Sequence, residues 1–413
     1  MKRVAYKFFL CLWLFPAALA ELSYQDFELP PHDYFKRTPT DRFTQMKSAL
    51  ESGELKLDRS GEKEFLADFL KVFDIPISSQ LLVFSTTSLQ LSLINPSNPR
   101  ALYFGEDIYV GYIPGGRIEI VSLDPELGAI FYIFEIPYGN TPVRVDRSTR
   151  CMNCHAGEDT GHVPGLVVKS VVPGLTGGSL VAYRINQSGH SIPIEHRLGG
   201  WYVTGLDGYT NHWGNLLGQF QEGTLVKIPN SPGERFRFSR YLTQTSDILP
   251  HLVHEHQVGF VNSVVGATYR TKTYQHTDAG KLTPEHEKEL DDQAETIVRY
   301  LLFADESQLP PTGIIGDPTF KREFQNNRRS VNGASLKDWD LKTRLFKYRC
   351  SFMIYSTVFN GLPKPMKLRI YHKLGIALSV NKPDQNYSFL GSEEKTKIRQ
   401  ILRGTLNDLP ENW

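Results

Sequence analysis

The sequence predicts an α+β fold, with a sheet-rich N-terminal and central region that carries a cofactor site and a mainly helical C-terminal region. Short β-rich runs separated by turn residues occupy residues 81–134, whereas apolar residues at helical spacing dominate beyond residue 246. The composition, 40% hydrophobic and 22% charged over 413 residues, supplies enough apolar material for a core. We therefore expect four consecutive regions: 1–20, 21–145, 146–245 and 246–413.

Residues 1–20 are typical of a cleaved signal peptide. A positive start at Lys2, Arg3 and Lys7 precedes the short apolar run Phe8–Phe15, and small residues lead to a cleavage site near Ala20. The alternative is an uncleaved membrane anchor, but the run is too short to span a bilayer, and no later segment is long enough. The sequence therefore predicts a periplasmic or otherwise exported protein without an integral membrane span.

Region 21–145 should begin with helical structure and continue as an antiparallel sheet. Residues 41–75 carry apolar side chains at helical spacing, at Phe65, Leu66, Phe69, Leu70 and Phe73. Asn95-Pro96, Pro114-Gly115-Gly116 and Asp124-Pro125 then separate short β-rich runs. The predicted strands are Leu81–Thr86, Leu89–Ile94, Ala101–Phe104, Ile108–Tyr112, Ile118–Ser122 and Ala129–Ile133.

Region 146–245 should carry the cofactor and further strands, and region 246–413 should be helical. The predicted strands are Leu166–Val172, Leu180–Ile185 and Trp201–Thr204. Ser246-Asp247 and Thr283-Pro284-Glu285 are typical helix starts, with a capping side chain and an early proline. A last helix is expected from about Ser392 to Leu406.

The cofactor prediction rests on Cys151-Met152-Asn153-Cys154-His155, a Cys-x-x-Cys-His sequence. Two thiols at this spacing add across the two vinyl groups of one haem, and the histidine that follows reaches the iron from the proximal side. A thioredoxin-like redox pair would need a βαβ setting, and a zinc site would need a second Cys/His pair nearby. The sequence therefore predicts one covalent haem c.

The other two cysteines are not expected to bind the cofactor. Cys11 lies within the predicted signal peptide and would be removed with it. Cys350 lies among large apolar residues, which indicates a buried, inert thiol, with an intermolecular disulfide as the alternative. Four cysteines in a chain of this length are too few for a disulfide scaffold.

Beyond the haem motif, the chain resembles a family of large exported single-haem proteins from planctomycete-type bacteria, usually labelled only as cytochrome c domain proteins. The resemblance covers most of the chain after the signal peptide and departs from the family pattern at Leu198 and Trp213. It implies haem binding and electron transfer, without a substrate. The matching stretches are Ser85–Gln90, Pro99–Phe104, Asp107–Gly111, Gly199–Gly205, Glu255–Gln257 and Leu341–Ser356.

An electron-transfer haem usually has a second axial ligand, either methionine or histidine. His212 follows a predicted strand in a loop beside Trp213, and His256 lies at the centre of the apolar stripe of its helix. If it is not a ligand, His212 is a surface loop residue, and His256 is a hydrogen-bonded core residue. We rank His212 first, His256 second and His190 third, ahead of the scarce methionines Met46, Met353 and Met366.

Three arginines precede the motif, at Arg144, Arg147 and Arg150. Guanidinium groups bind carboxylates bidentately, so these side chains are candidates for pairing with the haem propionates. The alternative is a solvated, charged turn.

The sequence therefore predicts an electron-transfer protein, and the alternative is a haem enzyme or ligand sensor with an open distal position. A carrier would exchange electrons with a redox partner protein or a small-molecule donor or acceptor. The formal charge of +1 gives no excess of positive charge for nucleic-acid binding. A non-haem structural or interaction protein is the remaining class.

Overall fold

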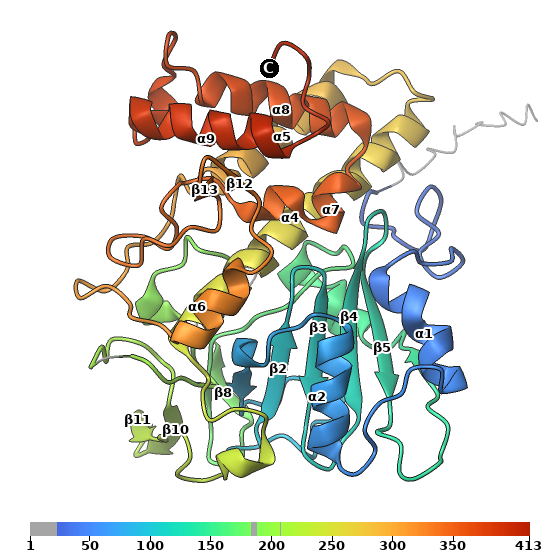
Figure 1. Ribbon diagram of the computed structural model, residues 1–413, viewed down its shortest axis with the longest axis vertical. Helices are drawn as coiled ribbons and strands as arrows, with labels where there is room; N and C mark the ends of the chain where they lie inside the picture. Colours follow the sequence, from blue (N-terminus) through green and yellow to red (C-terminus); the bar gives the residue numbers. More distant parts are fainter. Residues whose placement is uncertain (1–22, 183–187, 207) are drawn as a thin grey trace, which may run out of the picture.

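The computed structural model describes residues 23–182, 188–206 and 208–413. It has an α+β fold: strands form the N-terminal and central part, and helices form most of the C-terminal part (Figure 1). The predicted signal peptide at 1–20 lies outside the described residues, as does the end of the predicted strand Leu180–Ile185.

The central element is a seven-stranded antiparallel sheet. Its strands lie in the order β6-β5-β4-β3-β2-β1-β9, so neighbours along the chain pair as hairpins from β1 to β6. One predicted turn precedes β2, and the other two separate β3 from β4 and β4 from β5; Gly128, with φ of 77°, opens β5 after its turn. The strands are β1 (Leu81–Val83), β2 (Arg100–Phe104), β3 (Ile108–Tyr112), β4 (Ile118–Asp124), β5 (Gly128–Phe134), β6 (Asp146–Arg147) and β9 (Trp201–Tyr202).

Helices α1 (Arg42–Ser52) and α2 (Glu62–Val72) cover one face of this sheet. Phe43 of α1 packs against Tyr132 of β5 with ring centroids 4.7 Å apart, and Phe69 of α2 lies 5.7 Å from Phe134. Gly53, with φ of 74°, ends α1, so the predicted helical stretch 41–75 is two helices rather than one.

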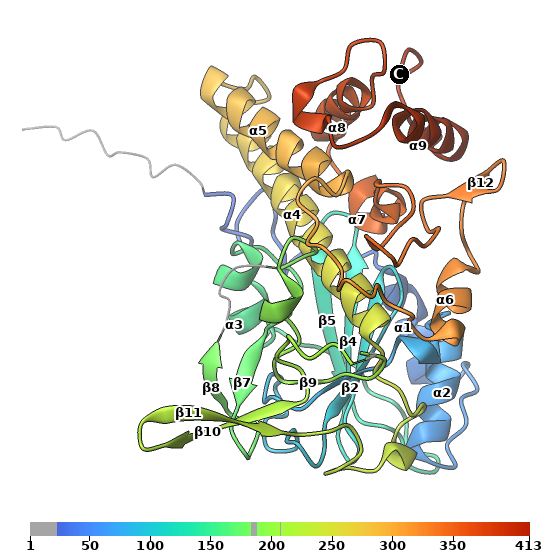
Figure 2. The same cartoon turned by 90° about the vertical axis from the view of Figure 1, so that its left-hand side faces the viewer.

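The opposite face carries α3 (Met152–His155), the hairpin of β7 (Val171–Pro173) and β8 (Ser179–Ala182), and the 30-residue helix α4 (Ile248–Thr277) (Figure 2). The hydroxyl of Tyr109 on β3 donates to Oε1 of Gln257 on α4 at 3.3 Å. Alternate side chains of each strand point to opposite faces, so the sheet separates α1 and α2 from the haem motif.

The helical C-terminal part begins where the sequence predicts. The Asp247 carboxylate accepts from the backbone N–H of Leu249 at the start of α4, and the Thr283 hydroxyl caps α5 (Pro284–Leu301). The predicted last helix is α9 (Ser392–Thr405). Between them lie α6 (Pro318–Gln325), the short hairpin of β12 (Ser330–Val331) and β13 (Ala334–Ser335), α7 (Thr357–Asn360) and α8 (Lys364–Ala377).

One strand prediction was wrong, and three predicted strands are shorter in the structure, including Leu81–Thr86, of which only β1 is a strand. Residues Leu89–Ile94 form turns, because the Gln90 side chain accepts from the Arg117 N–H and donates to the Arg117 carbonyl, which closes the loop onto itself. The predicted strand Leu166–Val172 is reduced to β7, and Trp201–Thr204 to the two residues of β9. The hairpin of β10 (Leu216–Gln221) and β11 (Thr224–Pro229) was not predicted.

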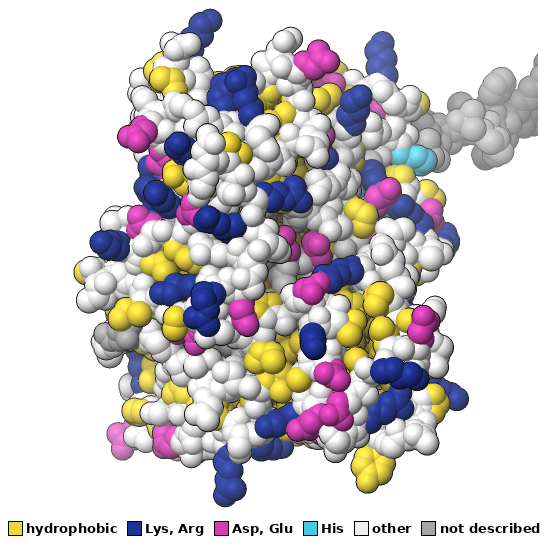
Figure 3. Space-filling view, in the orientation of Figure 1, with side chains coloured by type: hydrophobic (Ala, Val, Ile, Leu, Met, Phe, Trp, Pro, Cys, Tyr) yellow, Lys and Arg dark blue, Asp and Glu magenta, His cyan; other side chains and the backbone are white. Residues whose placement is uncertain are grey.

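The surface agrees with the near-neutral charge. On the face shown in Figure 3, basic and acidic side chains are interspersed rather than gathered by sign. Within the described ranges, no helix combines the length and apolar character that a membrane crossing requires.

Candidate cofactor site

The two motif cysteines lie one helical turn apart at α3. Cys151 is half-buried and Cys154 is exposed, and both are free thiols. The Cys151 thiol donates to the Ser148 hydroxyl at 3.3 Å. Because residues three apart on a helical turn lie on the same side, this turn presents both thiols to one partner, as attachment to a single haem requires.

The hydrogen bond of the His155 ring fixes which nitrogen is free. Nδ1 of His155 lies 2.9 Å from the carbonyl oxygen of Gly165. A carbonyl only accepts, so Nδ1 carries the proton and donates, and Nε2 keeps its lone pair. Burial lowers the pKa of His155 to about 4, which keeps the ring neutral. A histidine that ligates a metal is normally held this way, with its other nitrogen bound to a carbonyl.

Gly165 is itself held against α4. The Asn262 side chain accepts from the N–H of Leu166 and donates to its carbonyl, each at 2.8 Å. A Cβ on Gly165 would lie 2.5 Å from the Asn262 Oδ1 atom, so glycine is required for this close approach. The backbone N–H of Gly165 also donates to the His155 carbonyl at 2.8 Å. Asn262 therefore positions the carbonyl that orients His155.

Replacing Asn262 by leucine is expected to lower the free energy of unfolding by roughly 2–4 kcal/mol, because two polar groups of the buried Leu166 backbone lose their partner. Ser263→Ala is the matched control. The Ser263 hydroxyl is buried without a hydrogen-bond partner, so its removal should cost almost nothing. Urea unfolding of the two variants measures the difference, and equal losses would contradict the positioning role of Asn262.

The His155 ring lies over the sheet, next to an ion pair. Its centroid is 4.6 Å from that of Phe131 on β5. The Arg100 guanidinium on β2 binds the Glu119 carboxylate on β4 at 2.9 Å, and its charge helps to lower the pKa of His155. The buried Nε of Arg100 has no hydrogen-bond partner, which leaves a donor free for a carboxylate such as a haem propionate. Two free thiols, an oriented imidazole and this unpaired donor fit a covalent haem.

The three candidate arginines differ from one another in burial. Arg147 is half-buried and donates to the carbonyls of Tyr34 and Arg37, at 2.8 and 3.3 Å. It belongs to the sheet face opposite α3, because it pairs with Tyr132 rather than with a neighbour of His155. Arg144 and Arg150 are exposed.

His256 and His190 bind each other in the core. Their Nδ1 atoms are 2.7 Å apart, and Nε2 of His256 lies 2.7 Å from the Ser351 hydroxyl. Both ring nitrogens of His256 are therefore occupied, as in the core interpretation that the sequence left open.

His212 lies beyond the far edge of the sheet. The backbone on either side of it is tied to the β9 region, since Trp213 donates to the Arg197 carbonyl and Asn215 to that of Trp201. Strand β9 is five strand spacings from β5, roughly 24 Å. This placement separates His212 from His155, although its buried Nδ1 has no partner.

The methionines do not approach the motif either. Met46 lies on α1, which covers the sheet face opposite α3. Met353 and Met366 are fully buried in the C-terminal helical part.

Sequence reasoning missed Arg100, Asn262 and His254. His254 lies on α4 and is only 4% exposed, with its ring 5.3 Å from that of Phe104 and 5.7 Å from that of Tyr109. At 100° per residue, a helical wheel with His256 at the centre of the apolar stripe places His254 away from that stripe. However, the first half of α4 is buried on all sides, so the apolar stripe does not show which of its residues face the sheet.

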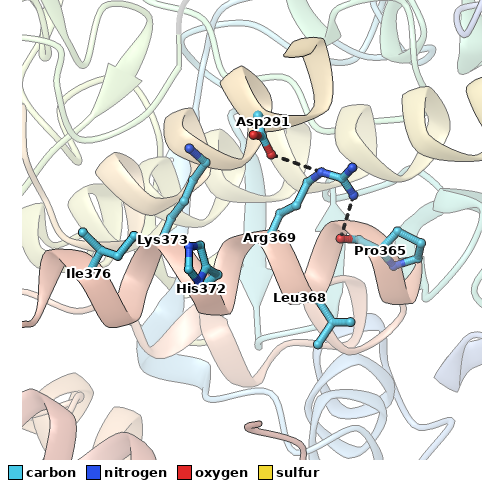
Figure 4. Close-up of a pocket in the computed structure, with 7 residues that line it drawn as sticks. All are labelled: Asp291, Pro365, Leu368, Arg369, His372, Lys373 and Ile376. Carbon is cyan, nitrogen blue, oxygen red and sulfur yellow. Dashed lines mark hydrogen bonds and ion pairs between the residues drawn. The ribbon is translucent and has the colours of Figure 1, made fainter. Parts of the chain in front are cut away.

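The described part of the chain has a hollow beside the motif loop and another in the helical C-terminal part. One, of about 740 Å³, is next to the motif loop and is lined by residues 158–161, by Asn262 and by residues of the segment 188–193. The other lies between α5 and α8, where Arg369 binds Asp291 at 3.1 Å and donates to the Pro365 carbonyl (Figure 4). Only the first borders the candidate site.

Among the described residues, no three His, Cys, Asp or Glu side chains form a group that could hold a metal ion by themselves. Comparison with known proteins gives no match to a protein-family model, a curated protein or a solved structure.

Proposed function

We propose that this chain is an exported c-type haem protein, similar to cytochrome c, that transfers electrons through one haem bound to Cys151 and Cys154. The observation that supports this most directly is the hydrogen bond from His155 Nδ1 to the Gly165 carbonyl. It leaves Nε2 as the free nitrogen of a neutral ring, which is the form that ligates iron.

The haem supplies a one-electron couple when bound, and the chain sets the conditions for it. His155 would ligate the iron, Asn262 and Gly165 fix the orientation of its ring, and Arg100 would offer its unpaired donor to a propionate. The sheet and α4 exclude water from one side of the site. The exposed Cys154 indicates that an edge of the haem would remain near the surface, where a redox partner protein or a small-molecule electron donor or acceptor reaches it.

Expression with the c-type maturation machinery tests this function. Wild-type protein should retain haem in a denaturing gel, whereas Cys151→Ser with Cys154→Ser should lose it, because the thioether bonds no longer form. Cys350→Ser is the matched control, since that thiol is fully buried in the C-terminal part. Wild-type protein without covalent haem would contradict the proposal.

The hollow beside the motif loop favours a second candidate, a haem enzyme or ligand sensor with an open distal position. Its volume of about 740 Å³ is within the range of small-molecule sites. Rapid binding of CO to the reduced wild-type protein would favour this function over electron transfer.

A further inference from the structure

Four side chains form one row across the sheet on the face that carries α3. The strand register pairs Phe104 with Tyr109, Tyr109 with Val121, and Val121 with Phe131. Residues that are directly opposite each other share a face, so this row runs from β2 to β5 at one level.

Two histidine rings lie on this row, on either side of Val121. The His155 ring packs against Phe131 of β5, and the His254 ring packs against Tyr109 of β3 and Phe104 of β2. Two strand spacings separate β3 from β5, on the order of 10 Å. Bonds from a metal to imidazole nitrogens are about 2 Å long. Two such bonds bring the ligating nitrogens about 4 Å apart, so a flat macrocycle bound by both rings would lie over Val121, the position of the row between them.

The sheet beneath this space is incompletely covered. Val121 and Leu102 are only partly buried, although both belong to inner strands of the sheet. Gly111 is paired with Leu102 on one side and with Glu119 on the other, and the side chains of Glu119 and Arg100 lie within 4 Å of the place where its Cβ would be. The floor is therefore apolar at Val121 and Leu102 and carries the Arg100–Glu119 ion pair beside them, which suits a flat apolar ring system that bears carboxylates.

His254 is a buried polar residue without a partner. Within the described part of the chain, no hydrogen bond reaches its imidazole, although a buried imidazole normally has one. Its helix neighbours His251 and His256 are both hydrogen-bonded. A neutral imidazole that makes no hydrogen bond keeps a lone pair for a ligand.

We propose that His254 is the second axial ligand of the haem iron, opposite His155. This assignment rests on the proposed function and names the ligand set of that site. It replaces the ranking of His212, His256 and His190 made from the sequence. His212 lies at the far edge of the sheet, and the ring nitrogens of His256 already bind His190 and Ser351.

Absorption and electron paramagnetic resonance spectra of the matured protein test the assignment. Wild-type protein should be low-spin, and His254→Gly should become high-spin, bind CO rapidly, and return to low-spin when imidazole is added. His254→Met, which keeps a ligating side chain of similar length, should remain six-coordinate and shift the reduction potential upward. His251→Gln is the matched control on the same helix and should leave the spectrum unchanged.

The outcomes separate this inference from the proposed function. If wild-type protein carries no covalent haem, the proposed function fails. If it carries haem but is high-spin, or if both His254 variants keep the wild-type spectrum and potential, only the assignment of His254 is overturned. Covalent haem is measured in the gel for every variant, so that a variant that fails to mature is recognised. If His254→Gly fails to mature, the spectrum and reduction potential of His254→Met test whether His254 is the ligand.

Discussion

Replacement of His155 by glutamine is expected to abolish the low-spin haem spectrum and to lower haem incorporation by about tenfold or more. The iron would lose its proximal nitrogen, and the hydrogen bond to the Gly165 carbonyl would no longer orient a ligand. His162→Gln is the matched control, because His162 lies in the same loop and is exposed. The ratio of haem absorbance to protein absorbance, measured after identical maturation, gives the size of the effect.

Circular dichroism separates ligand loss from unfolding in this experiment. His155 packs against Phe131, so its replacement also removes a ring contact in the core. A His155→Gln protein with wild-type secondary structure and an unchanged low-spin spectrum would show that another residue holds the proximal position. Equal loss of haem in His155→Gln and His162→Gln would show that the loop as a whole, rather than His155, is required.

Local signals made the inner strands and the Cys151–His155 part of the candidate site predictable. Strands β2 to β5 lie within two residues of their predicted bounds, because tight turns such as Asp124-Pro125 separate them. Cys151, Cys154 and His155 are recognised by spacing alone, and α3 places them on one turn. Each of these signals involves residues that are close together in the chain.

The surroundings of His254 and Asn262 in the candidate site depend on contacts between distant segments. His254 meets Phe104 and Tyr109 about 150 residues away, and Asn262 meets Leu166 across 96 residues. Sequence periodicity shows which side of α4 is apolar, but this helix contacts α5, α7, α8 and Tyr109 of the sheet, so it is buried on more than one side. The sequence therefore favoured His256, which is buried against His190, over His254.

The missed hairpin did have a local signal. Leu216–Gln221 and Thr224–Pro229 flank Glu222-Gly223, and both turn residues have positive φ, at 49° and 81°. This is the backbone of a tight two-residue hairpin turn, for which glycine at the second position is favourable. By contrast, Leu89–Ile94 has strand-like composition, but the side-chain hydrogen bonds of Gln90 hold it as a loop.

Haem-free protein is expected to lose stability steeply as the pH falls below 6.5. Burial lowers the pKa of His32 to about 4, that of His251 to about 3, and that of His190 well below its usual value. Below pH 6.5 the unfolded chain binds protons at these three positions and the folded chain does not, so acid favours unfolding. Burial raises the pKa of Glu306 to about 7, so between about pH 4.5 and 7 the folded chain binds a proton there that the unfolded chain does not. Acid therefore favours folding at Glu306, which offsets the contribution of one histidine.

These four groups alone give a net difference of two protons, or roughly 3 kcal/mol per pH unit between about pH 6 and 5. Burial also lowers the pKa of His155, His254 and His256, so these residues make the slope steeper in haem-free protein. Because small domains are stable by only about 5–15 kcal/mol, this slope is enough to unfold the protein near pH 4.

Urea unfolding at pH 7.5, 6 and 5 measures this slope. His32→Gln should reduce the slope by about one proton, or about 1.4 kcal/mol per pH unit, since the His32 ring is buried against Tyr269. His372→Gln, at an exposed position on α8, should leave it unchanged. A slope that is the same in wild-type protein and His32→Gln would show that His32 is protonated in the folded protein, and therefore that its burial does not keep it neutral.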